Sequence, residues 1–77
     1  MKENRRFIVE SWLTKYESIF NNNGLDRWFK FPLGTMQKFY KYNRELKNKR
    51  INKIYRSVEK LISDFEELKT KSNNDTT

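Results

Sequence analysis

The sequence contains no cysteine and no histidine, and only two glycines and one proline occur among its 77 residues. Without cysteine, a disulfide framework, a thiolate metal site and thiol catalysis are excluded. Without histidine, the commonest general base and metal ligand is missing. The longest unbroken apolar run, Phe7 to Val9, is too short to cross a bilayer or to act as a secretory leader. We therefore expect a cytoplasmic protein that has no cofactor, no metal ion and no membrane partner.

Apolar residues are few but large. They make up 35% of the chain, and 12 of them are Phe, Tyr or Trp. A chain of this length has room for only one domain. We therefore expect a single small core filled by bulky side chains.

Positive charge is concentrated in the middle of the chain. The formal net charge is +7, and residues 27–56 hold ten basic residues against Glu45 alone. The flanking segments are neutral (1–26) or slightly acidic (57–77). Large apolar side chains are interleaved with the basic residues, so this segment should fold and hold its charges in fixed positions. A polyanion is therefore the first partner to consider.

Apolar residues recur three and four positions apart through most of the chain, which predicts helices and no strands. The expected class is an all-α domain over residues 1–71 with a helix-turn-helix core at about 22–43. Four helices are predicted, at 3–20, at 22–29, at 32–42 with Pro32 as its first residue, and at about 48–71 with Asn48 as its cap. Residues 72–77 contain no apolar side chain and are expected to form a disordered tail.

The last predicted helix is too long for a domain of this size, so its far end should overhang. Its apolar positions follow a seven-residue repeat, with Ile51, Val58 and Phe65 in one row and Ile54, Leu61 and Leu68 in the other. This is the pattern of a two-helix seam. One interpretation is that the stripe only covers the chain's own core. The other is a homodimer held by Leu61, Ile62, Phe65 and Leu68.

Two short helices around a tight connection are typical of proteins that read the DNA major groove, because the first helix braces the second. Leu25 and Phe29 lie four positions apart on the first segment, and Met36 and Phe39 lie three apart on the second. If both pairs face a common core, the residues left pointing outward are Leu33, Gly34, Gln37, Lys38 and Lys41.

In this region the sequence resembles the phage-repressor and Cro-like helix-turn-helix proteins, especially small regulators of phages and mobile elements. The resemblance runs through residues 25–44, LDRWFKFPLGTMQKFYKYNR, and continues weakly to Ile54. The family's hydrophobic and capping places are filled by Leu25, Phe29, Phe31, Pro32, Thr35, Met36 and Phe39. Two of its glycines are replaced, one by Lys30 in the turn and one by Tyr42 at the end of the second helix.

The resemblance implies a double-stranded DNA-binding transcriptional regulator in a bacterial or phage-infected cell, associated with the nucleoid. The base-contacting residues would be Leu33, Gly34, Gln37 and Lys38. Gln37 suits adenine, Lys38 the acceptors of guanine, and Leu33 a thymine methyl group. The phosphate-contacting residues would be Lys30, Thr35, Lys41, Arg44, Lys47, Lys49, Arg50 and Lys53.

Two other binding functions are open at this point. The helix-turn-helix body could instead bind and inhibit a host enzyme that processes nucleic acids. Binding of single-stranded or structured RNA would require Tyr40, Tyr42 or Tyr55 to be exposed as stacking surfaces. No enzymatic activity is expected, because Asp64, Glu66 and Glu67 read as surface charge on the last helix.

Overall fold

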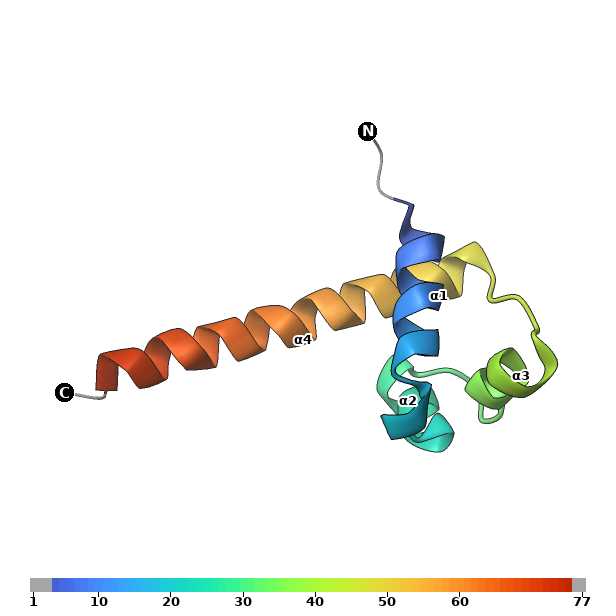
Figure 1. The fold of residues 1–77 in the computed structure, drawn as a ribbon, viewed down its shortest axis with the longest axis horizontal. Helices are drawn as coiled ribbons and strands as arrows, with labels where there is room; N and C mark the ends of the chain where they lie inside the picture. Colours follow the sequence, from blue (N-terminus) through green and yellow to red (C-terminus); the bar gives the residue numbers. More distant parts are fainter. Residues whose placement is uncertain (1–3, 76–77) are drawn as a thin grey trace.

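The computed structural model describes residues 4–75, with side chains described through Ser72, and that part of the chain is all-helical. The elements in order are α1 (Arg5–Lys15), a single 3₁₀ turn η1 (Glu17–Ile19), α2 (Asn22–Phe29), α3 (Thr35–Tyr42) and α4 (Asn48–Asp75). Helices α1, α2 and α3 form a small body around the first turns of α4, and the rest of α4 projects away from it (Figure 1). The predicted fold class, an all-α domain with a long C-terminal helix, is confirmed.

Asparagine side chains begin the first two helices. The Oδ1 atom of Asn4 accepts a hydrogen bond from the Phe7 amide at 3.0 Å, and Oδ1 of Asn21 accepts one from the Gly24 amide at 2.9 Å. Each bond satisfies an N–H group that has no partner within its own helix. Asn4 and Asn21 are therefore the N-caps of α1 and α2.

Helix α1 ends earlier than predicted. It stops at Lys15, and the chain tightens into η1 before α2 begins. This turn brings the Phe20 ring to within 4.9 Å of the Trp12 ring, measured between centroids. The predicted helix over 3–20 is thus a shorter helix followed by a turn that folds Phe20 back onto the body.

Two boundaries around α4 also differ from the prediction. Asn48 is the first residue of the helix, and its side chain accepts a hydrogen bond from Arg6 Nη2 at 2.8 Å, so it joins α4 to α1 and does not cap the helix. At the other end, α4 continues to Asp75, through most of the tail that was expected to be disordered. The last two residues of that tail lie outside the described part of the chain.

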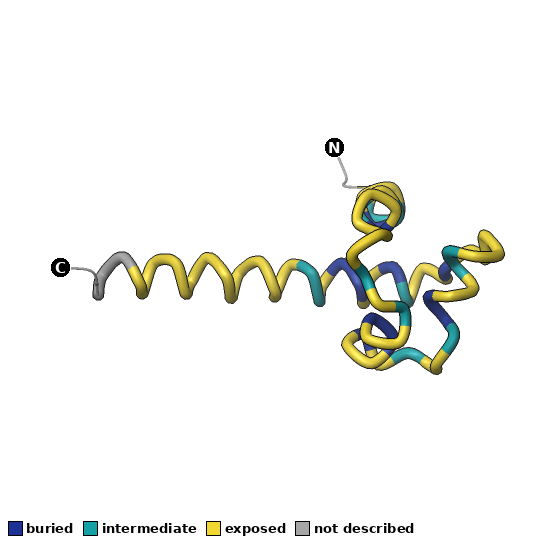
Figure 2. Tube along the Cα trace, turned by 60° about the horizontal axis from the view of Figure 1, so that its bottom comes forward, coloured by how far each residue is buried: buried dark blue, intermediate teal, exposed yellow. Residues whose placement is uncertain are grey.

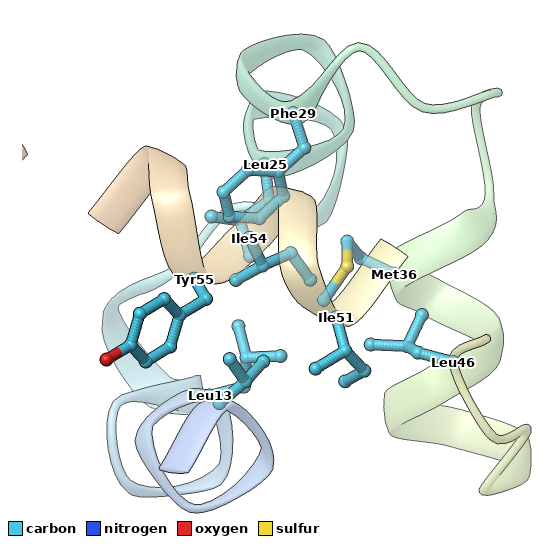
Figure 3. Close-up of a cluster of buried hydrophobic side chains, with 9 residues drawn as sticks. Leu13, Leu25, Phe29, Met36, Leu46, Ile51, Ile54 and Tyr55 are labelled. Carbon is cyan, nitrogen blue, oxygen red and sulfur yellow. The ribbon is translucent and has the colours of Figure 1, made fainter. Parts of the chain in front are cut away.

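The core lies where all four helices meet. Its buried apolar side chains converge on one centre, and most of them are drawn in Figure 3: Val9, Leu13, Leu25, Phe29, Met36, Leu46, Ile51, Ile54 and Tyr55. Trp12, Phe20, Phe31, Phe39, Tyr40 and Val58 pack around them, partly buried. Because the last buried member is Tyr55, the body is complete within the first two turns of α4.

Candidate nucleic-acid interface

The turn between α2 and α3 is held by a buried carboxylate. Asp26, in α2, is fully buried. Its Oδ2 accepts a hydrogen bond from the Gly34 amide at 2.9 Å, and its Oδ1 accepts one from the Met36 amide at 3.0 Å. Asp26 therefore caps α3 from the preceding helix. This fixes the orientation of α3 against α2 and leaves the turn between them as an ordered loop.

Two residues in this turn have left-handed backbone conformations. Lys30, which ends α2, has φ 60° and ψ 44°, and Gly34, which precedes α3, has φ 93°. Lys30 stands where the resembling family has glycine, and here it adopts the conformation that glycine usually supplies. At the far end of α3, Asn43 does the same with φ 52°. Both replaced glycines are thus accommodated without a change in helix order.

The predicted start of α3 at Pro32 is wrong. The helix begins at Thr35, and residues 32–34 form a turn in which the Thr35 amide bonds the Pro32 carbonyl at 3.2 Å. The Thr35 side chain is buried, and its hydroxyl donates to the same carbonyl at 2.7 Å. The Thr35 hydroxyl is therefore engaged within the turn, and we do not assign it a phosphate contact.

Helix α3 has one inner and one outer face. Met36 is fully buried and Phe39 is half-buried, whereas Gln37, Lys38 and Lys41 are exposed. The inner face is tied to α1 by the Tyr40 hydroxyl, which donates to the Leu13 carbonyl at 2.8 Å. Burial, with a smaller contribution from the nearby Glu17 carboxylate, raises the pKa of Tyr40 to about 12. The phenol therefore stays protonated at neutral pH.

Basic side chains line a groove between this turn and the start of α4. The groove is formed by Phe31 and Pro32 together with five cationic residues: Lys30, Lys47, Lys49, Arg50 and Lys53. The Arg50 guanidinium lies 5.4 Å from the centroid of the Phe31 ring, a cation–π distance that holds the arginine against the turn. Residues far apart in the sequence thus form one positive surface.

A second groove continues this surface toward α3. Pro32, Lys47 and Arg50 line both grooves, and the second adds Leu33, Thr35, Lys38, Arg44, Glu45 and Leu46. Leu33 is 72% exposed at the outer edge of the turn. The two grooves therefore bring together most of the predicted phosphate-contacting residues and two of the predicted base-contacting ones. Gln37 and Lys41 lie outside both grooves, on the exposed face of α3.

The positive charge of this surface is not neutralised by ion pairs. Among the described residues, ion pairs join Arg6 to Glu10, Lys60 to Asp64 and Lys69 to Glu66. None involves a basic residue of segment 27–56. Glu45 is the one carboxylate lining the second groove, so the combined surface stays strongly positive.

The residues required for stacking on unpaired bases are mostly buried or held in the body. Tyr55 is 9% exposed and lies beneath the Arg5 guanidinium, which is 4.4 Å from its ring centroid. Tyr40 is held in the body by its bond to Leu13, and only Tyr42, 67% exposed, presents an open ring face. Among these three tyrosines a single exposed ring does not make a stacking platform.

Sequence reasoning missed Asp26, although a signal was present. Asp26 is the only acidic residue between Glu17 and Glu45, and it directly precedes the basic segment 27–56. A lone carboxylate in such a setting is a candidate for a structural hydrogen-bonding role. The cation–π contact of Arg50 with Phe31 left no comparable signal, because the two residues meet only through the tertiary fold.

Comparison with known protein families, with curated proteins and with solved structures finds no match to this chain. No helix in the described part of the chain is long and apolar enough to span a membrane. The described residues also contain no group of three or more acidic side chains positioned to hold a metal ion. The candidate interface therefore has to be interpreted from its own geometry and charge.

Proposed function

We propose that this protein binds double-stranded DNA, with the outer face of α3 in the major groove and the surrounding basic surface on the phosphates. The observation that carries the proposal is the continuous, unpaired positive surface formed by the α2–α3 turn, α3 and the start of α4. Phosphate neutralisation by such a surface supplies much of the affinity of DNA-binding proteins.

The arrangement of α2 and α3 supports this mode of binding. A groove-reading helix must be rigid and must project from the body. The Asp26 cap fixes α3, while Gln37 and Lys38 extend from its exposed side. Base contacts are assigned to these two residues and to Leu33 and Gly34 in the turn before them. Glutamine can pair with adenine, and lysine can reach the acceptors of guanine.

Phosphate contacts are assigned to the cations around α3. They are Lys30, Lys41, Arg44, Lys47, Lys49, Arg50 and Lys53, all of them exposed or partly exposed. Sequence-specific binding of this kind would suit a transcriptional regulator, as the resemblance to small phage and mobile-element proteins implies. Whether the bound site is repressed or activated depends on where it lies relative to a promoter.

The first test separates base contacts from phosphate contacts. A pool of random duplexes is selected on the wild-type protein, and affinities for the selected and an unrelated duplex are measured by fluorescence anisotropy at several salt concentrations. Lys49→Gln with Lys53→Gln should reduce the slope of log affinity against log salt by roughly two, on both duplexes. The matched control, Lys60→Gln with Lys69→Gln, removes the same charge from the far part of α4 and should leave the slope nearly unchanged.

Gln37→Ala and Lys38→Ala should affect mainly the selected duplex, unlike the phosphate-contact variant, which affects both. Each should lower affinity for the selected duplex by about 1–3 kcal/mol, because each removes one set of hydrogen bonds to a base, with a smaller effect on the unrelated duplex. Equal reductions on both duplexes would remove these residues from base recognition. If no duplex binds and a host nucleic-acid-processing enzyme is instead retained by the immobilised protein, the alternative function of enzyme inhibition replaces the proposal.

A further inference from the structure

The apolar face of α4 continues beyond the body that it helps to form. Within the body this face buries Ile51, Ile54 and Tyr55. Farther along the same stripe, Leu61 is 51% exposed, Ile62 54%, Phe65 60% and Leu68 64%. Every described residue from Glu59 to Ser72 is exposed (Figure 2). Large apolar side chains arranged in a row on an exposed helix mark an interaction surface.

An apolar groove lies where this stripe meets α1. It is lined by Ile8, Val9, Trp12, Tyr55, Val58, Glu59 and Ile62. Since Val58 and Ile62 belong to the stripe, the groove and the exposed part of α4 form one continuous surface. Ile8, on the α1 side, is 43% exposed. Whatever covers the stripe must therefore also reach α1.

The charge along α4 distinguishes the two directions in which a second copy of this helix could cover the stripe. Its first part carries four cations and no acid: Lys49, Arg50, Lys53 and Arg56. From Ser57 to Asp75 three lysines face five acids, so this part is net negative. A second α4 in the opposite direction keeps the two basic parts at opposite ends of the pair, so they do not lie side by side. A parallel pair would place the two basic halves together, and like charges repel.

We infer that two copies of this chain associate through α4 in an antiparallel, two-fold symmetric pair. Leu61 then lies level with Phe65 of the second copy, and Val58 lies level with Leu68 of the second copy, at the mouth of the groove beside α1. The seven-residue apolar repeat matches such a seam. Because the same patch is used on both copies, the contact closes and forms no filament.

The area of this surface lies near the lower limit for a specific dimer. Covering the four bulky side chains on both copies removes roughly 800 Å² from water, and the groove residues Ile8, Trp12 and Val58 bring the total toward that limit. Specific interfaces begin at about 1,200 Å². The pairing does not depend on DNA binding, so the two proposals can fail separately.

Sedimentation equilibrium of the full chain tests the association. The wild type should be dimeric, and Phe65→Asp with Leu68→Asp should raise the dissociation constant by at least about 100-fold, because two charges replace apolar contacts on each copy. Both residues are exposed, so the variant should keep its helical circular dichroism spectrum. The matched control, Ser63→Asp with Thr70→Asp, adds the same charge to the opposite face of α4 and should stay dimeric. A monomeric wild type, or an equally dissociated control, would overturn the inference.

Disulfide trapping tests the direction. The chain has no cysteine of its own, so Leu61→Cys and Phe65→Cys variants each carry a single thiol. Cysteines bond only when their Cα atoms lie within about 7 Å. An antiparallel pair therefore predicts that a mixture of the two variants forms the mixed disulfide, while neither variant alone crosslinks efficiently. Efficient crosslinking of Leu61→Cys alone would indicate a parallel pair and contradict the inference.

Discussion

At the residue scale, the position of α3 depends on one side chain. Asp26 lies in α2, yet both of its carboxylate oxygens bond amides at the start of α3. These amides have no partner within their own helix, and burial makes an unpaired N–H costly. Exposed basic residues can be substituted with little effect on the stability of the body, whereas the buried Asp26 cannot.

Replacing Asp26 should therefore lower the free energy of unfolding much more than replacing an exposed acidic residue does. Asp26→Ala leaves the Gly34 and Met36 amides without their acceptor and should lower the free energy of unfolding by about 3 kcal/mol. Asp26→Asn should also destabilise the fold, because one oxygen still accepts a hydrogen bond while the new –NH2 group, a donor, faces the other amide N–H. Asp64→Asn, at an exposed acid in α4, should change stability by less than about 0.5 kcal/mol. Urea unfolding followed by circular dichroism measures all three, and an Asp26→Ala variant as stable as Asp64→Asn would contradict this role.

At the element scale, the sequence predicted which helices form better than where they end. The spacing of Leu25, Phe29, Met36 and Phe39 locates α2 and α3 because local periodicity records which face is buried. The preference of proline for the first helical turn predicts a start of α3 at Pro32, three residues before the observed start at Thr35. The observed start is set by Asp26, a partner from the preceding helix. Local patterns do not contain that information.

The backbone strain in the turn between these helices can be tested at Lys30. A side chain in the left-handed region is strained, and glycine relieves the strain. We expect Lys30→Gly to raise the free energy of unfolding by about 1 kcal/mol and, under the proposed function, to weaken DNA binding because a phosphate-facing cation is removed. Lys30→Gln is the matched control, since it removes the charge and keeps the strain. Thermal unfolding and fluorescence anisotropy separate the two effects. Equal stability of both variants would show that the backbone at Lys30 is not strained.

At the scale of the whole molecule, the chain consists of a body and a projecting helix. Its radius of gyration is 14.8 Å, above the roughly 11.5 Å expected for a compact chain of this length, because α4 extends past the body (Figure 1). In the proposed antiparallel pair, the Ile54 residues of the two copies would lie about 27 Å apart along the helix axis, and the two bodies would be separated by about the same distance. On one face of DNA, major-groove sites one helical turn apart are separated by about 34 Å. The projecting helix would thus set the distance between two DNA-reading bodies.

The separation of the chain into a body and a projecting helix predicts how a chain without the projecting part unfolds. A chain shortened after Lys60 keeps every buried core residue, because the last of them is Tyr55, so it should still unfold cooperatively. Under the inferred pairing, the unfolding temperature of the full chain should rise with protein concentration, since association stabilises the folded state by mass action. That of the shortened chain should not change with concentration, and differential scanning calorimetry at several concentrations measures both. If the shortened chain showed no cooperative transition, the projecting helix would be needed for the fold of the body itself, and the separation into a DNA-reading body and a pairing helix would be wrong.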